Sequence, residues 1–381
     1  MKKTHLHIVL LNTAHNSFDD RVFYHQAKTL SEADYQVTIV STVETMQTIH
    51  DGINICARNF NIFSRKEKQQ KITALLHTLS PDVVICDTPA AVWAAHRYRK
   101  KHKIKIIYDV TEWYPSRIHL KNDKGLQKWI RCIMLMLFNL YAGALPTGFI
   151  FGEYYKSKVF RFLYFWKPFQ HLPYFPDLNY IKPAPIQNIQ QTIRLFYGGS
   201  LSPKRGIPQV IQSTVKAAQR KPETIFQLHL ICNLSTEKDA CYFNALTSNL
   251  PANVEIIHQP LLSFSDFCQY VPQMDLFFDL RAISWEHNHS LPIKLFYYLA
   301  CERPIIYAKL KSITTFFSDI SFGYLVNPSN TEVIAEKIVH YINHPEIYRE
   351  HCQNALRLSK EKYNWGKIKN DFIQFIGLKP F

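Results

Sequence analysis

Residues 193–212 read IRLFYGGSLSPKRGIPQVIQ, an apolar run that stops at two glycines and leads into a helix starting near Arg205. Short continuous apolar runs that alternate with helices are typical of a parallel sheet covered on both faces. The same order of strand, loop and helix recurs along the chain. We therefore expect an α/β protein built from doubly wound sheets.

The first half of the chain shows this alternation throughout. Apolar runs that fit strands lie at 5–12, 35–42, 53–57, 82–87, 103–110 and 148–153. Helical segments are expected between them, at 19–33, 65–79, 90–101 and 126–145. Together these elements predict one doubly wound, Rossmann-like domain.

A second domain is expected because 381 residues exceed the size at which single cores stop growing, roughly 250 to 300 residues. Residues 176–192 lose the alternation and gain Pro, Asn and Gln, which is typical of a linker. Strands then resume at 193–200, 226–233, 254–260, 274–281, 303–309 and 322–328, before a helical tail from 331 to about 376. Two Rossmann-like domains, 1–178 and 179–360, should then face each other across a ligand-binding cleft.

The formal net charge of +15 favours phosphate-bearing partners, which are nucleic acid, acidic lipid or a nucleotide. We find no nucleic-acid reading module or aromatic RNA motif in the sequence, so a nucleic-acid partner is not expected. The eight cysteines are scattered singly, and we expect no secretory signal at the start. The cysteines are interpreted as buried free thiols in a reducing cytoplasm.

Two basic runs carry much of the charge. The run 97–105, RYRKKHKIK, fits a solvated helix end. In the run 156–167, Phe, Tyr and Trp are interleaved with Lys and Arg, which suits the interface of an anionic membrane. The apolar segment 126–145 lies just upstream, but Lys128 and Arg131 argue against a membrane span. It is predicted to be a buried helix or a helix on the surface.

The loop after residues 193–197 is a candidate phosphate site. Gly198 and Gly199 let the backbone approach a ligand closely, and the next helix presents free amides and the positive end of its dipole. Lys204 and Arg205 add full positive charges at the same place. The alternative is a structural turn, since the loop matches neither known phosphate-binding fingerprint.

A second helix start lies in SLPIKLFYYLACERPIIY, residues 290–307. Ser290 can cap the helix, Pro292 suits its first turn, and Lys294 falls where the dipole disfavours a cation by about 0.3–1 kcal/mol. A bound anion would compensate this cost, whereas the alternative is that Lys294 extends into water. We therefore expect two helix starts to share one diphosphate.

These motifs together resemble the retaining glycosyltransferases of the two-domain GT-B fold, in particular family 4. The resemblance covers nearly the whole chain and is carried by six segments in the family's order. They are 15–40 (HNSFDDRVFYHQAKTLSEADYQVTIV), 108–115 (YDVTEWYP), 173–177 (PYFPD), 197–212 (YGGSLSPKRGIPQVIQ), 291–306 (LPIKLFYYLACERPII) and 360–368 (KEKYNWGKI). The last of these is similar to the family's crossover helix, which implies that 361–381 returns toward the first domain.

The resemblance implies the transfer of a sugar from a nucleotide sugar, of UDP or GDP type, to an acceptor hydroxyl with retention at the anomeric carbon. By position, Lys204 or Arg205 would act with Lys294 to neutralise the departing diphosphate, so no metal or other cofactor is expected. The implied donor contacts are Gly198, Gly199, Arg281, His289 and Tyr297. The implied acceptor contacts, in the first domain, are Asp19, Arg21, Thr111 and Glu112. The expected acceptor is a lipid-linked or membrane-presented glycan, which suits a cytoplasmic protein at the inner face of an anionic plasma membrane.

The sequence also departs from the family pattern. His289 and Tyr297 stand where family members commonly carry glutamates, and Thr111 stands where they often carry a histidine. Because of these departures, the alternative hypothesis stays open that the chain is a non-catalytic relative that binds or scaffolds a partner.

Other polar groups are expected to have structural roles. Asp19 and Asp20 are expected to cap a helix rather than bind metal, and Arg21 has pairing with Asp19 as its structural alternative. Glu286, His287 and His289 lack the spacing of a zinc site, so no metal is expected there. His5 and His7 alternate on a strand and are expected at its core or rim.

Overall fold

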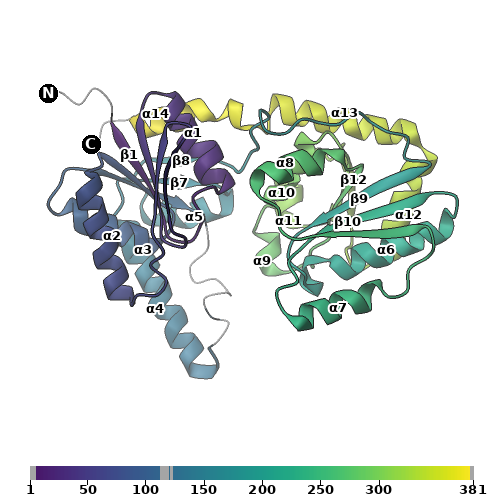
Figure 1. Cartoon of the computed structure of the whole chain (residues 1–381), viewed down its shortest axis with the longest axis horizontal. Helices are drawn as coiled ribbons and strands as arrows, with labels where there is room; N and C mark the ends of the chain where they lie inside the picture. Colours follow the sequence, from purple (N-terminus) through teal and green to yellow (C-terminus); the bar gives the residue numbers. More distant parts are fainter. Residues whose placement is uncertain (1–5, 112–119, 121–122, 378–381) are drawn as a thin grey trace. The chain divides into compact units, whose positions relative to one another are not determined.

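The computed structural model describes residues 6–111, 120 and 123–377 of the chain (Figure 1). The chain divides into two compact units, Met1–Tyr174 with Ile368–Phe381 (unit 1) and Phe175–Lys367 (unit 2). Each unit holds one largely parallel sheet flanked by helices, so the predicted fold class of two doubly wound α/β domains is confirmed.

The sheet of unit 1 has eight strands. Its order is β3(Met46–His50), β4(Ile53–Ala57), β2(Gln36–Ser41), β1(His7–Asn12), β5(Val83–Cys86), β6(Lys105–Val110), β7(Gly148–Phe151) and β8(Phe169–His171). Every neighbouring pair is parallel except β3 and β4. The sequence pattern missed β3 because all five of its residues are exposed, which removes the apolar run that marks a strand.

Helices cover both faces of this sheet. They are η1(Asp20–Ala27), α1(Lys28–Glu32), α2(Arg65–Leu79), α3(Pro89–Arg99), α4(Gly125–Ala144), α5(Tyr154–Leu163) and α14(Lys369–Gly377). Figure 1 shows α2 and α3 on one face and α1 with α14 on the other. Local sequence sets the starts: Ser64 and Glu67 form a capping box at α2, and Thr88 caps α3 ahead of a proline.

The last helix, α14, packs within unit 1, although unit 2 intervenes in the sequence. The ammonium of Lys105 on β6 donates to the carbonyl oxygens of Phe375 at 2.7 Å and Ile376 at 3.1 Å. A cation at the carboxyl end of a helix satisfies carbonyls that have no partner inside the helix. Burial lowers the pKa of Lys105 to about 8. This contact fixes the end of α14 to the sheet.

The sheet of unit 2 has six parallel strands. Its order is β11(Val254–Gln259), β10(Ile225–Ile231), β9(Thr192–Gly198), β12(Leu276–Asp279), β13(Ile305–Ala308) and β14(Gly323–Val326). Its helices are α6(Ile207–Arg220), α7(Glu237–Thr247), α8(Phe264–Tyr270), α9(Trp285–Asn288), α10(Ile293–Ala300), α11(Lys311–Phe316), α12(Thr331–Asn343) and α13(Pro345–Glu361). Short 3₁₀ turns lie at Pro203–Arg205, Val271–Gln273 and Trp365–Lys367.

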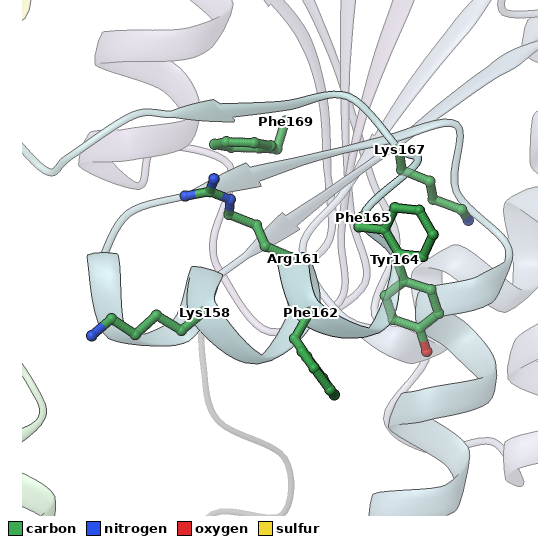
Figure 2. A pocket seen from close by; sticks show the side chains of 7 residues that line it. All are labelled: Lys158, Arg161, Phe162, Tyr164, Phe165, Lys167 and Phe169. Atoms are coloured by element: carbon green, nitrogen blue, oxygen red, sulfur yellow. The ribbon is translucent and has the colours of Figure 1, made fainter.

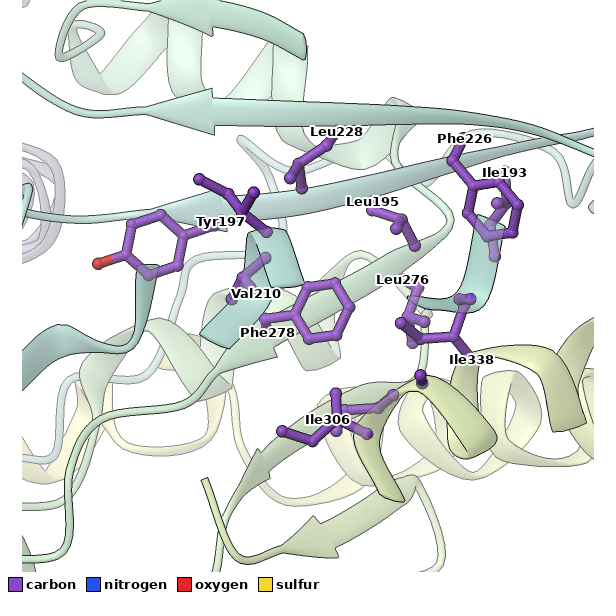
Figure 3. Close-up of a cluster of buried hydrophobic side chains, with 14 of the residues drawn as sticks. Ile193, Leu195, Tyr197, Val210, Phe226, Leu228, Leu276, Phe278, Ile306 and Ile338 are labelled. Atoms are coloured by element: carbon purple, nitrogen blue, oxygen red, sulfur yellow. The ribbon is translucent and has the colours of Figure 1, made fainter. Parts of the chain in front are cut away.

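The core of unit 2 consists of apolar side chains from neighbouring strands and from the helices that cover them (Figure 3). Leu195 of β9 lies in register with Leu228 of β10 and with Leu276 of β12. Because side chains alternate between the faces of a strand, these residues share one face. That face packs against α6 and α12 through Val210 and Ile338. Both faces of the central strands are buried, which explains why they read as continuous apolar runs.

Two expected elements differ in detail. The segment predicted as one helix over 19–33 is a π-helix, Asp20–Ala27, followed by the short α1. The helix expected from about Arg205 begins at Ile207, after a 3₁₀ turn and Gly206. The segment 172–191 contains neither helix nor strand, and β7, Gly148–Phe151, is shorter than the apolar run expected at 148–153.

A large-to-small substitution on β10 tests this core. Leu228→Ala should lower the free energy of unfolding by about 2–5 kcal/mol, because the fully buried side chain leaves a cavity. Urea denaturation followed by circular dichroism measures the change. Ile225 on the same strand is 42% exposed, so Ile225→Ala is the matched control and should cost about 1 kcal/mol or less. Equal effects of the two variants would contradict the assignment of Leu228 to the core.

Candidate functional site

The strand order of unit 2 points to one place on its sheet. Strand β9 pairs with β10 on one side and β12 on the other, so the chain winds outward in both directions from this pair. Loops leaving the carboxyl ends of two such strands diverge, and open α/β sheets bind ligands at this switch point. Here β9 ends at Gly198 and β12 ends at Asp279.

The loop after β9 is fastened to the loop after β12. The amide of Ala282 donates to the carbonyl oxygen of Lys204 at 2.9 Å. Gly206 has φ of +90°, and a Cβ at this position would overlap the backbone carbonyl of Leu280. Only glycine therefore fits between the two loops. The loop that carries Lys204 and Arg205 is held against the end of β12.

Lys294 reaches the same place from the start of α10. It is the second residue of that helix, and its Nζ donates to the carbonyl oxygen of Gly198. A Cβ on Gly199, where φ is +156°, would lie 3.0 Å from Nζ of Lys294. The ring centroid of Tyr197 lies 5.7 Å from the same nitrogen. Gly199 thus leaves room for the ammonium beside the end of β9.

A buried ion pair supports this group. Arg281 donates to the carboxylate of Asp279 through Nε at 2.8 Å and Nη2 at 2.7 Å, and both side chains are buried. Burial alone would raise the pKa of Asp279, but Arg281 and then Lys294 outweigh it, so the pKa lies below its usual value. The carboxylate is therefore ionised, and the bidentate geometry fixes the guanidinium.

Lys294 carries an electrostatic cost in this position. Its pKa falls to about 8, mainly because burial disfavours the charged form and also because Arg281 and Arg205 lie nearby, while Asp279 opposes the fall. A group of three cations with one carboxylate has an uncompensated positive charge. An anion bound here would restore the charged form of Lys294.

The structure separates the two basic residues of the 3₁₀ turn. Arg205 lies close enough to influence the pKa of Lys294, Asp279 and Tyr197. Lys204 is held instead by its backbone carbonyl, which accepts from the amide of Ala282. Both side chains are exposed. Arg205 is therefore the residue that the geometry brings together with Lys294 and Arg281.

His289 and Tyr297 are positioned differently from these cations. The ring of His289 lies 4.6 Å from that of Trp285, and its Nδ1 is 2.7 Å from the Trp285 carbonyl oxygen. Tyr297 is buried, with its ring 5.7 Å from Phe267 and 6.2 Å from Phe264 of α8.

Tyr298 and Asp279 belong to the site but were not predicted. Tyr298 stacks on Phe277 with ring centroids 4.3 Å apart, and a Cβ on Gly198 would lie 3.8 Å from its hydroxyl. That hydroxyl is fully buried and has no hydrogen-bond partner among the described residues. Asp279 was detectable, since it precedes Arg281 by two positions at the end of a strand run and so shares its face.

The expected acceptor contacts lie in unit 1, and two of them have structural partners. Asp19 caps η1 by accepting from the amides of Arg21 and Val22, so its predicted capping role is confirmed. Arg21 is buried and donates to Asp109 at 2.7 and 2.8 Å and to the carbonyl oxygen of Leu172 at 3.0 Å. Its guanidinium pairs with Asp109 rather than Asp19, and these contacts leave it poorly placed to meet a substrate.

Thr111 follows β6 directly. Its hydroxyl donates to the carbonyl oxygen of Asp87 at 3.4 Å, and its own carbonyl accepts from Lys156. Glu112, the other expected residue of this loop, lies outside the described residues.

The remaining histidines and cysteines that the sequence singled out have structural surroundings. In the described part of the chain, we find no group of three His, Cys, Asp or Glu residues that could hold a metal ion. His287 is buried, with Nδ1 2.6 Å from the carbonyl oxygen of Ala282. His7 is a buried strand residue with Nε2 2.9 Å from the Thr38 hydroxyl. All eight cysteines are free, and only Cys132 and Cys241 deviate from the predicted burial.

Comparison with solved structures identifies the fold. Sucrose-phosphate synthase from Thermosynechococcus elongatus matches with a TM-score of 0.69 at 12% identity, over 97% of this chain and 98% of that one. HepE from Anabaena, solved with UDP-glucose, matches at 0.67 and 13% identity, over 97% and 99%. A glycosyltransferase from Rickettsia africae matches at 0.66 and 12%, over 98% of each chain. The chain has the GT-B fold.

This likeness extends over both units of the chain and concerns the arrangement of the backbone. No family model matches the sequence, and no curated protein matches it either. The GT-B fold is thus shared with glycosyltransferases at low identity.

A substitution at Gly206 tests the junction between the two loops. Gly206→Ala should lower the free energy of unfolding by more than about 2 kcal/mol, because it adds both a strained φ and an overlap with Leu280. Gly125, with φ of +52° and open space around it, provides the control. Gly125→Ala should lower the free energy of unfolding by about 1 kcal/mol, because it adds backbone strain without an overlap. A loss at Gly206 no larger than at Gly125 would contradict the packing described.

Proposed function

We propose that the chain is a retaining glycosyltransferase related to family 4, which moves a hexosyl group from a nucleotide sugar to a glycan. The observation that carries this proposal is the convergence of Lys294, Arg205 and the glycine pair at the switch point of unit 2. It is supported by similar solved structures that hold such ligands. These are HepE with UDP-glucose and an E. coli protein described as trehalose-6-phosphate, bound with UDP-2-fluoro glucose.

The donor diphosphate would bind where the positive charge is uncompensated. Lys294 contributes an ammonium and Arg205 a guanidinium, while the first amides of α10 point their dipoles at the same place. The glycine pair lets phosphate oxygens approach the backbone. Arg281 stays paired with Asp279 and would not contact the ligand.

Transfer breaks the bond between the anomeric carbon and a diphosphate oxygen, and negative charge develops on that oxygen. Lys294 and Arg205 stabilise this charge, which is the role a metal ion fills in other transferases. The acceptor hydroxyl forms the new bond on the same face of the sugar and gives its proton to the departing phosphate. No protein general base and no metal are needed in this sequence of events.

The proposed acceptor is a lipid-linked or cell-surface glycan used in polysaccharide synthesis. Unit 1 would carry the acceptor side, with Thr111 directly after β6 and Asp19 at the start of η1. Glu112, which follows Thr111 in the sequence, is the further acceptor contact that we propose. The proposed location is the cytoplasm, at the inner face of the plasma membrane.

A second candidate function is binding of a nucleotide sugar without turnover. Tyr297 favours it, because its buried ring packs against α8 where a glutamate would otherwise be expected to bind ribose. Transfer and hydrolysis assays with several nucleotide sugars distinguish the two functions. Binding of a nucleotide sugar without formation of a transfer or hydrolysis product would favour the hypothesis of a non-catalytic binding protein.

Single substitutions at the cation group test donor binding. Lys294→Met and Arg205→Ala should each weaken the binding of UDP or GDP by roughly 10- to 100-fold, because each removes a charged hydrogen bond to phosphate. Nucleotide-induced thermal shift and calorimetry measure the effect. Lys238→Ala, at an exposed lysine of α7, is the control of equal charge and should change little. Unchanged nucleotide affinity in Lys294→Met would move the donor site elsewhere.

The pH dependence of donor binding follows from the lowered pKa of Lys294. Below about pH 8 the ammonium is charged in the free protein, and a bound diphosphate raises its pKa further. Affinity should therefore be constant below pH 8 and fall by up to about tenfold per pH unit above it. Lys294→Arg stays charged and should flatten this profile. A flat profile for the unmodified protein would show that Lys294 does not bind the anion.

A further inference from the structure

Unit 1 carries an unusually apolar exposed surface on α4 and α5. We define the α4–α5 surface by its exposed members, which are Leu126, Trp129, Ile130, Ile133, Met134, Leu137, Val159, Phe162, Phe165 and Trp166. Phe162 is 83% exposed, Phe165 81% and Trp129 70%. Side chains of this size are rarely left in water together, and such patches mark interaction sites.

The position of α4 explains why its apolar residues remain exposed. It packs on α3, where Phe138 and Tyr141 lie 6.4 and 5.1 Å from the ring of Trp93, and not on the sheet. Only Ala142 and Gly143 of its residues are buried. Figure 1 shows the first half of α4 extending beyond the layer formed by α2 and α3.

The end of α5 is fastened to the end of α4. The hydroxyl of Tyr164 donates to the carbonyl oxygen of Leu140, and Lys167 donates to those of Ala144 at 2.6 Å and Pro146 at 2.7 Å. Lys167 therefore caps the carboxyl end of α4. Figure 2 shows Tyr164 beside α4 and Phe162 pointing away from the strands. The two helices present their aromatic residues from one fixed framework.

The charges on this surface have one sign. From Lys124 to Lys167 the chain has seven basic residues and a single acidic one, Glu153. Glu153 is buried, and its carboxylate lies 3.6 Å from Lys156. Arg131 pairs with Asp123 at 3.0 Å. No described carboxylate pairs with Lys124, Lys128, Lys158 or Arg161, which leaves four cations without a counter-charge from the described chain.

Two of these cations line a pocket of about 320 Å³ (Figure 2). The guanidinium carbon of Arg161 lies 4.3 Å from the ring centroid of Phe169, and Nζ of Lys158 lies 4.9 Å from that of Tyr154. The remaining lining is Phe162, Tyr164, Phe165, Lys167 and Phe169. Aromatic rings with cations beside them suit an interface where phosphate groups lie above hydrocarbon.

We propose that the α4–α5 surface docks on a bilayer of anionic phospholipid, with Trp129, Phe162 and Phe165 entering the interface and Lys158 and Arg161 bound to headgroup phosphates. No helix among the described residues is long and apolar enough to cross a membrane. A second copy of this chain is the less favourable occupant, because it would bring the same unpaired cations together. An anionic membrane supplies both the apolar region and the opposite charge.

This inference deepens the proposed function, because it names the surface by which unit 1 would meet a membrane-presented acceptor. Only the identity of that acceptor rests on the proposed function. Docking itself requires neither donor nor turnover. Vesicle binding and nucleotide binding are measured separately, so failure of one proposal is distinguishable from failure of the other.

Flotation of the full chain with vesicles tests the proposal. The protein should float with phosphatidylcholine vesicles that contain phosphatidylglycerol, and poorly with phosphatidylcholine alone. Lys158→Glu with Arg161→Glu should weaken partitioning by roughly 30-fold or more. Phe162→Ser with Phe165→Ser should weaken it by at least tenfold, because two exposed rings no longer enter the interface.

The control is Lys66→Glu with Lys238→Glu, which makes the same change in net charge at exposed sites on other helices, α2 and α7. It should retain most of the binding. Equal losses in control and test variants would overturn the assigned surface, and so would the absence of flotation. Light scattering that shows a dimer abolished by Phe162→Ser with Phe165→Ser, without vesicle binding, would assign the surface to a second copy instead.

Discussion

The candidate site of unit 2 depends on placing the ammonium of Lys294 against the backbone at the end of β9. Burial alone makes this arrangement costly, and the lowered pKa of Lys294 records the cost. Three features make it tolerable: a carbonyl acceptor at Gly198, the nearby carboxylate of Asp279, and the absence of a side chain at Gly199, which leaves room for Nζ. The remaining cost is relieved when an anion binds, so the site is held ready for one.

Much of the fold was predictable because both sheets are largely parallel and their central strands are buried on both faces. Their strands read as apolar runs, and capping residues such as Ser64 and Thr88 mark the helix starts. The exposed strand β3 and the π-helical form of Asp20–Ala27 were not predictable. The first has no apolar pattern, and the second depends on partners far along the chain, such as Asp109 for Arg21.

The candidate site was predictable where local chemistry decides the position of a residue. Glycines after a strand and a lysine in the first turn of a helix led to Gly198, Gly199 and Lys294. Charge alone did not distinguish Arg205 from Lys204, because the turn that orients them is set by contacts of Gly206 with Leu280. Tyr298 was missed because its role comes from stacking on Phe277, across the sheet face.

The docking of α14 on Lys105 has a consequence for the order of folding during synthesis. Unit 2 is continuous in sequence, whereas unit 1 is completed by α14, Lys369–Gly377, which follows unit 2 in the chain. While the ribosome translates residues 175–367, the ammonium of Lys105 lacks the carbonyls that it later holds. Unit 2 can therefore fold while unit 1 still lacks α14, which is synthesised after it.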